Sequence, residues 1–223
     1  MAMSNRSIKQ QINEHLAEIA QAIGHANRLE ILEYLAQGQH TVEELTILTG
    51  LSFANTSRHL QILRRAKLVQ TERKGKYILY CMTNQDEVVT LLRALGVVGE
   101  RNWAEIQKIM DDYFNAQDEL KPISREELLL RLQEGDVTLL DVRPEHEFNL
   151  GHLPQALNIP LKDLQNKLTQ LPKHHEIIAY CRGAYCVLSV EAIKYLQEQG
   201  FKVRRLEDGF PEWKAAGLAV EQI

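Results

Sequence analysis

Beyond residue 123 the sequence alternates short strand-like runs with helical stretches. The strand-like runs are VTLLDV, HEIIAYC and KVRRL, and helices are predicted at 161–170, at 187–199 and near the C-terminus. Strand–helix alternation of this kind is typical of a parallel sheet covered on both faces by helices. We therefore expect an α/β domain over residues 119–223, which opens on a helix capped by Ser124.

The first half of the chain has a different, mainly helical pattern. Apolar residues at steps of three and four predict an amphipathic helix over 7–23, and further helices are predicted over about 29–38, 42–48 and 52–66. Two β-rich runs separated at Lys74-Gly75 predict a hairpin, and a long helix is predicted over 85–113, weakened by Gly96 and Gly99. A polar stretch over 115–122 is the predicted linker, so we expect a first domain over 1–118.

Composition bounds the class of protein. With 44% hydrophobic and 25% charged residues, the 223-residue chain resembles an ordinary globular protein of two small domains. The N-terminus has no apolar leader and no run is long enough to cross a membrane, so we expect a cytoplasmic protein without a membrane partner. Three cysteines, an odd number, fit a reducing compartment.

A net charge of −4 argues against a nucleic-acid partner, but the charge is unevenly distributed. Residues 58–76 contain seven basic side chains and one acidic side chain. Such a stripe, on a helix after a short turn and on a hairpin, suits phosphate contacts and insertion into the major groove. The candidate DNA-binding residues are Asn55, Ser57, Arg58, Gln61, Arg64, Arg65, Arg73, Lys74 and Lys76.

The segment from HANRLEILEYL to RKGKYILY resembles the winged helix–turn–helix of the ArsR/SmtB repressors. The resemblance rests on Arg28-Leu29-x-Ile31-Leu32, on Ser57-Arg58-His59-Leu60 and on a wing centred at Gly75. It implies a homodimer built from the first and last helices of this half, bound to double-stranded operator DNA with recognition helices ~34 Å apart. Many relatives sense metals through cysteines or histidines, but 42–48 has no cysteine and 85–112 no histidine, so we expect no metal or other cofactor here.

Cys181 lies between a predicted strand and a predicted helix. The loop that follows it consists of Arg182, Gly183, Ala184, Tyr185 and Cys186. Loop amides, the helix N-terminus and a neighbouring arginine all favour a thiolate, and a glycine lets the loop curl tightly. The alternative is that this cysteine ends a buried strand as an ordinary core residue.

Two further segments resemble the signatures of the rhodanese family: LLDVRPEHEFNLGHLPQALNIPL over 139–161 and LEDGFPEWKAAGLAV over 206–220. The resemblance implies that Cys181 accepts a sulfane sulfur as a persulfide from a donor such as thiosulfate, a persulfide or a polysulfide. Phosphatases that share this fold hold phosphate with an arginine six residues after the cysteine. Val187 occupies that position, so a phosphatase is not expected.

Other residues are assigned supporting or alternative roles. By its position in the rhodanese signature, Asp141 is expected to orient the loop, and Arg143 to form a structural ion pair with Glu147. Cys186 is expected either to form a disulfide or trisulfide with Cys181 or to pack at the start of a helix. Cys81 is expected to be a small buried residue, with a redox role as the alternative.

The leading hypothesis is a DNA-binding transcriptional regulator whose rhodanese domain carries or senses sulfane sulfur on Cys181. A first alternative is a sulfurtransferase enzyme whose DNA-binding module serves for targeting or dimerisation. A second alternative is a repressor that responds to soft metals or arsenicals through Cys181 and Cys186. The fold expected in each case is a mainly α winged helix–turn–helix domain followed by an α/β rhodanese-like domain.

Overall fold

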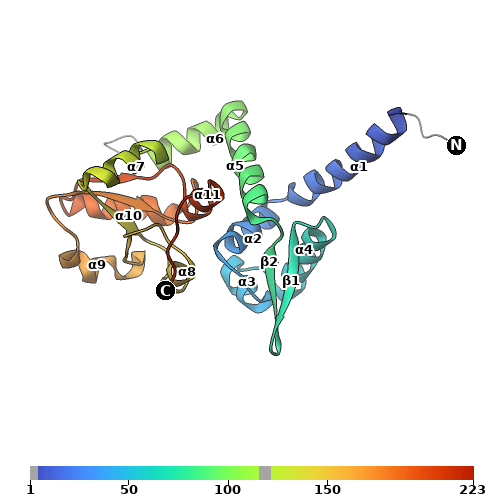
Figure 1. Ribbon diagram of the computed structural model, residues 1–223, viewed down its shortest axis with the longest axis horizontal. Helices are drawn as coiled ribbons and strands as arrows, with labels where there is room; N and C mark the ends of the chain where they lie inside the picture. Colours follow the sequence, from blue (N-terminus) through green and yellow to red (C-terminus); the bar gives the residue numbers. More distant parts are fainter. Residues whose placement is uncertain (1–4, 116–121) are drawn as a thin grey trace. The chain divides into compact units, whose positions relative to one another are not determined.

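The computed structural model describes the backbone of residues 5–115 and 122–223, and the chain divides into two compact units, Met1–Val88 and Val89–Ile223 (Figure 1). The predicted domain boundary at residue 118, with most of the predicted linker, lies outside the described residues. None of the helices over the described residues is both long enough and apolar enough to cross a membrane.

The first unit is mainly helical and contains one hairpin, as the sequence pattern predicts. Its elements are α1 (Asn5–Ile23), α2 (Ala26–Gln37), α3 (Val42–Thr49), α4 (Phe53–Arg65), β1 (Val69–Lys74) and β2 (Tyr77–Met82). Thr41 and Glu44 form the capping box at the start of α3, and the Ser52 hydroxyl accepts a hydrogen bond from the Asn55 amide at the start of α4. β1 and β2 pair antiparallel, and the turn between them places Gly75 at a φ of +63°.

The long helix predicted over 85–113 is interrupted. Helix α5 (Gln85–Asn102) begins in the first unit and continues into the second, where α6 (Ala104–Ile109) and a π-helical segment, η1 (Met110–Asn115), follow it. The interruption falls at Trp103, which takes an extended conformation with φ −118° and ψ 108°. The helix passes through Gly96 and Gly99, the two positions at which the sequence predicts weakness, without a break.

The remainder of the second unit is an α/β domain with the parallel sheet predicted from the alternation. The strand order is β4–β3–β5–β6, and every pairing is parallel. Its elements are α7 (Arg125–Glu134), β3 (Val137–Asp141), α8 (Glu145–Leu150), β4 (Leu157–Asn158), η2 (Leu161–Asp163), α9 (Leu164–Lys167), η3 (Leu168–Gln170), β5 (Glu176–Tyr180), α10 (Val187–Glu198), β6 (Val203–Arg205) and α11 (Phe210–Ala215). The sequence reading missed α8 and β4, and the helix predicted over 161–170 consists of the three short pieces η2, α9 and η3.

Strand β5 is buried along its whole length, because its two faces contribute to different hydrophobic clusters. Ile177 and Ala179 pack in the cluster that includes Ile193 of α10, while Ile178 and Tyr180 pack in the cluster that includes Trp213 of α11. A two-sided core of this kind fixes the register of the strand. It also fixes the carboxyl end of the sheet, where loops that follow parallel strands form binding sites.

Candidate functional site

Helix α4 separates a buried face from a polar exposed face. Thr56, Leu60 and Leu63 are buried, at the three- and four-residue spacing of one helix face. The opposite face is polar and accessible: Asn55, Arg58, Gln61, Arg64 and Arg65 are exposed, and Ser57 is half-buried. A helix that follows a three-residue turn and presents these side chains has the shape and chemistry to contact base edges and phosphates.

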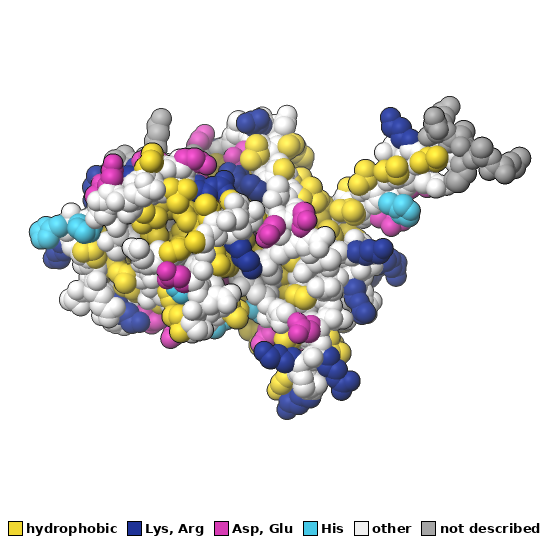
Figure 2. Space-filling model, viewed as in Figure 1, with side chains coloured by type: hydrophobic (Ala, Val, Ile, Leu, Met, Phe, Trp, Pro, Cys, Tyr) yellow, Lys and Arg dark blue, Asp and Glu magenta, His cyan; other side chains and the backbone are white. Residues whose placement is uncertain are grey.

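The hairpin β1–β2 carries the second part of the basic stripe. Arg73, Lys74 and Lys76 are exposed, and Figure 2 shows basic side chains gathered at the hairpin tip. Two of them have local contacts: Arg73 Nε donates a hydrogen bond to the Gly75 carbonyl at 3.2 Å, and Lys76 Nζ lies 5.2 Å from the centre of the Tyr77 ring. All of the predicted basic residues on α4 and the hairpin are therefore accessible to a polyanion.

Two histidines from different helices lie together. The rings of His25, at the start of α2, and His59, on α4, have centroids 4.7 Å apart. Burial lowers the pKa of His59, and the nearby His25, Arg28 and Arg58 lower it further. The sequence gives no signal for this pair, because the two positions are joined only by the packing of α2 against α4.

The loop after β5 is held at several points. The Phe210 amide donates a hydrogen bond to the Cys181 carbonyl at 3.0 Å, and Arg205 Nη1 donates to the Ala184 carbonyl at 3.0 Å. Within the loop the Cys186 amide donates to the Gly183 carbonyl at 3.1 Å. The position after a central parallel strand and before the N-terminus of α10 is the one that the sequence predicts for Cys181.

The two loop cysteines form a disulfide, with 6.2 Å between their α-carbons. Both are buried, Cys181 at 2% and Cys186 at 5% exposed. The sequence does not decide between a bond and simple packing for Cys186, and in the structure the two cysteines are bonded. Cys81 of β2 is a free cysteine, and it is partly exposed rather than buried, which corrects that expectation. Cys81 lies in a two-stranded hairpin whose middle positions are only half-buried, with Sγ 3.9 Å from the Gln70 carbonyl.

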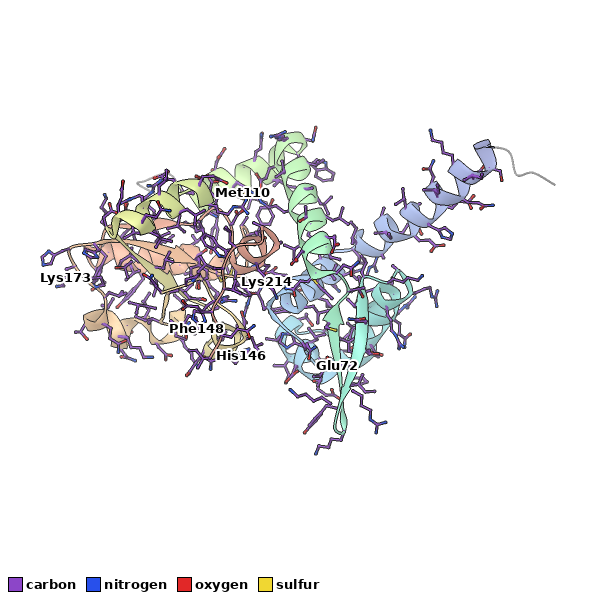
Figure 3. All side chains as sticks on the ribbon, in the orientation of Figure 1. Glu72, Met110, His146, Phe148, Lys173 and Lys214 are labelled. Atoms are coloured by element: carbon purple, nitrogen blue, oxygen red, sulfur yellow. A yellow bond between two sulfur atoms is a disulfide. The ribbon has the colours of Figure 1, made fainter. Side chains whose placement is uncertain are left out.

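Arg182 pairs with a carboxylate. Its guanidinium donates to both oxygens of Glu147 on α8, at 2.6 to 3.1 Å, and Glu147 is buried. Phe148 and His146, which flank Glu147, are labelled in Figure 3. The sequence predicts Arg182 as a cation beside the thiolate, and the structure adds that much of its charge is balanced by Glu147.

Arg143 has Asp141 as its bidentate partner, rather than Glu147 as the sequence reading expects. The Arg143 amide and guanidinium both donate to the Asp141 carboxylate, and Arg143 Nη2 also donates to the Gly151 carbonyl at 2.7 Å. Burial lowers the pKa of Arg143, but the charge of Asp141 and its hydrogen bonds outweigh burial and the pKa is raised. Glu147 contributes in the same direction through its charge.

A close backbone approach joins the loop to the segment before α11. A Cβ atom at Gly209 would lie 2.6 Å from the carbonyl carbon of Arg182 and would collide with Gly183, so only glycine fits. The Gly209 amide donates to Glu212 Oε2 at 3.0 Å. Burial raises the pKa of Glu212 to about 7.

The remaining loop side chain contacts α5 within the second unit. The Tyr185 hydroxyl donates a hydrogen bond to Glu100, and a Cβ atom at Gly96 would lie 3.1 Å from Tyr185 Cε2 and would collide with the hydroxyl. Burial and the bond to Glu100 raise the pKa of Tyr185. Gly96 thus provides space for a side chain of the loop.

Within 5–115 and 122–223, no three His, Cys, Asp or Glu side chains are grouped so that they would hold a metal ion.

Comparison with known proteins identifies the same two regions. Residues 25–71 match the bacterial regulatory proteins of the arsR family, and residues 124–216 match the rhodanese-like domain. An HTH-type transcriptional regulator of Mycobacterium tuberculosis is 37% identical over 209 residues, which cover 94% of this chain and 91% of that protein.

Two further relatives each match one part of the chain. A sulfurtransferase of Allochromatium vinosum is 33% identical over 100 residues, which cover 44% of this chain and 92% of that protein. A solved homodimeric winged helix–turn–helix DNA-binding domain from Mycobacterium bovis is 28% identical, with a TM-score of 0.42, and the match covers 47% of this chain and 94% of that one.

Proposed function

The chain belongs to the ArsR-family helix–turn–helix transcriptional regulators that carry a rhodanese domain, and from that premise we propose that it responds to sulfane sulfur, which it carries as a persulfide on Cys181. The observation that supports this most directly is the position of Cys181 at the carboxyl end of the central strand β5, in a loop that leads into the N-terminus of α10. A thiolate is favoured there by the helix dipole.

The proposed sulfur step starts from the reduced loop. The Cys181 thiolate attacks the sulfane sulfur of a donor such as thiosulfate. The sulfur–sulfur bond of thiosulfate breaks, sulfite leaves with the electron pair, and Cys181 retains the sulfur as a persulfide. Asp141, through the buried Arg143, and Gly209, through its approach to Gly183, are proposed to hold the loop in the shape that this attack needs.

The DNA-binding part of the proposal rests on the accessible stripe of α4 and the hairpin. Arg58 and Gln61 on the exposed face of α4 are proposed to contact base edges, while Lys74 and Lys76 of the hairpin contact phosphates. The DNA partner is double-stranded operator DNA. If the protein is a dimer, each protomer contacts one half-site of the operator.

A homodimer is proposed because α1 has an exposed apolar stripe. Ile8, Ile12 and Leu16 of α1 are all exposed, and Figure 2 shows a row of hydrophobic side chains along this helix. A second copy of the chain would cover this stripe. Light scattering should then give twice the chain mass for the wild type and a lower mass for Ile12→Asp.

The second candidate function is a sulfurtransferase whose DNA-binding unit serves only for targeting. The match to the rhodanese-like domain and the Allochromatium sulfurtransferase favour it. Fast turnover of thiosulfate with an added acceptor, unaffected by DNA and lost in Cys181→Ser, is the result that this alternative predicts. A regulator instead turns over slowly and binds DNA differently in its two sulfur states.

The decisive test compares DNA affinity at one salt concentration, because affinity for DNA depends steeply on salt. DNA selected from a random pool by the reduced protein serves as the probe. We expect wild type treated with a sulfane-sulfur donor to differ from reduced wild type by at least about fivefold in Kd, in line with ordinary coupling free energies. Cys181→Ser should show no change after the same treatment, and equal affinities for the two wild-type forms contradict the sensing function.

A further inference from the structure

We propose that Cys186 discharges the Cys181 persulfide within the loop, releasing hydrogen sulfide and leaving the Cys181–Cys186 disulfide as the lasting product. The inference rests on the proposed function, because it requires that Cys181 first accepts a sulfur. It adds a second reaction, in which sulfane sulfur is reduced to sulfide and the protein is the reductant.

The distance between the cysteines permits direct reaction. Their α-carbons are 6.2 Å apart, inside the range over which a disulfide forms without moving the backbone. The tight loop is compatible with this spacing because the Cys186 amide bonds back to the Gly183 carbonyl. The loop backbone therefore brings the two sulfur atoms within bonding reach.

Burial favours an internal acceptor over an external one. Cys181 is 2% and Cys186 5% exposed, and both belong to the same hydrophobic cluster. An external thiol has to enter this buried site, whereas Cys186 is already in place. Intramolecular partners held in a productive geometry react as if present at very high concentration.

The position of Cys186 also favours the thiolate that the reaction needs. It is the N-cap residue of the twelve-residue helix α10, and the Ser189 hydroxyl donates to its carbonyl at 2.9 Å. The N-terminus of a helix stabilises a negative charge. The guanidinium of Arg182 forms an ion pair with Glu147, which balances much of its charge. The positive end of the α10 dipole therefore remains to stabilise a thiolate on Cys186.

The chemistry balances without an outside oxidant. The Cys186 thiolate attacks Sγ of Cys181, the bond between Sγ and the carried sulfur breaks, and hydrosulfide leaves with the electron pair. The Cys186 proton passes to the solvent or to the departing hydrosulfide. The two thiols are together oxidised by two electrons to a disulfide, and the sulfane sulfur is reduced by two electrons to sulfide. An external dithiol reductant returns the loop to its starting state.

The test uses the full chain, reduced with a dithiol, desalted without oxygen and treated with one equivalent of thiosulfate, whose leaving group is sulfite rather than sulfide, and no thiol acceptor. Sulfide release and intact mass are followed together. We expect the wild type to release about one sulfide per chain and to lose the mass of two hydrogen atoms, as the exchange requires. Cys186→Ser should gain the mass of one sulfur atom and release no sulfide, and Cys81→Ser should behave like the wild type.

Two results overturn the inference while leaving the proposed function intact. One is a wild type that keeps the added sulfur as a persulfide or trisulfide without releasing sulfide. The other is sulfide release from Cys186→Ser at the wild-type rate. If Cys186→Ser takes up no sulfur while its circular dichroism matches the wild type, the proposed function itself fails. If the Cys186→Ser protein does not fold because a serine is buried at this position, Cys186→Ala serves as the second variant.

Discussion

Arg143 Nη2 lies 2.6 Å from Asp141 Oδ2, and neither side chain has exposed surface. The pair is also close to the cysteine loop, because the Arg143 guanidinium lies 4.4 Å from the centre of the Phe210 ring, and the Phe210 amide donates to the Cys181 carbonyl. A charge buried this completely depends on its partner. The pair therefore contributes both to the stability of the domain and to the position of the loop.

Asp141→Ala should be strongly destabilising, because it leaves the Arg143 charge buried and unpaired. We expect a loss of about 3–5 kcal/mol in the free energy of unfolding, measured with urea on the reduced chain. Glu127→Gln is the matched control, since the Glu127 carboxylate that pairs with Arg204 is on an exposed side chain, and should cost less than about 1 kcal/mol. Equal losses in the two variants would contradict the role of burial.

Gly209→Ala should impair the loop through a steric clash. The φ of Gly209 is −106°, which any residue adopts, so the cost comes from the collision of the new Cβ with the backbone of Arg182 and Gly183. A displacement of about 1 Å at a reacting group lowers rates by up to about 100-fold. We expect the rate of sulfur transfer to Cys181, measured as sulfite released in a single turnover with thiosulfate, to fall at least about tenfold.

The control for this variant is Gly135→Asn. Gly135 ends α7 at a φ of +73° with open space around it, and asparagine tolerates this conformation. It should form the persulfide at the wild-type rate. A Gly209→Ala protein that reacts as fast as the control would show that the close approach does not position the loop.

Local signals predicted the secondary structure where three or four neighbouring residues decide it. The caps at Thr41, Ser52 and Ser124 follow from such short-range hydrogen bonds. The break at Trp103 was missed because the apolar periodicity continues across it and the nearby glycines are stronger breakers by propensity. A tertiary contact explains why one of these positions is a glycine, since a side chain at Gly96 would collide with Tyr185.

The candidate site was predicted only in part for a related reason. The place of Cys181 follows from the order strand, loop, helix, which neighbouring residues encode. The partner of Arg182 cannot be predicted from the local sequence, because Glu147 is 35 residues away and is brought near by the parallel pairing of β3 and β5. Pairings of charged residues over such separations are set by the fold, and the sequence pattern alone cannot choose between Asp141 and Glu147 as the partner of Arg143.

Glu212 should make the stability of the second unit depend on pH. Burial raises the pKa of Glu212 from an ordinary value of 4.5 to about 7, so the folded protein holds a proton that the unfolded chain has released. Stability therefore falls as pH rises from about 4.5 to 7, and the stabilising contribution of the protonated form is lost over that window. Glu212→Gln keeps an acceptor for the Gly209 amide and removes the titration.

The measurement is the difference in unfolding free energy between Glu212→Gln and wild type at each pH. Other titrating groups cancel in this difference, which should grow in favour of the variant as pH rises through the window. A difference that stays constant with pH would show that Glu212 titrates alike in the folded and unfolded chain.

Gln61→Ala and Lys74→Ala should weaken DNA binding in different ways. Gln61 is exposed on α4, where it can contact a base edge, so its loss should cost about 1–3 kcal/mol of binding free energy on the selected DNA and little on random DNA.

Lys74 lies at the hairpin tip, where a phosphate contact is expected. Its loss should weaken binding to both DNAs alike and reduce the slope of log K against log salt by about 1. Glu43→Gln, on the exposed start of α3, serves as a control with a charge change outside the basic stripe. An unchanged salt slope for Lys74→Ala, or equal losses on both DNAs for Gln61→Ala, would contradict the assigned contacts, because base contacts discriminate sequence and phosphate contacts do not.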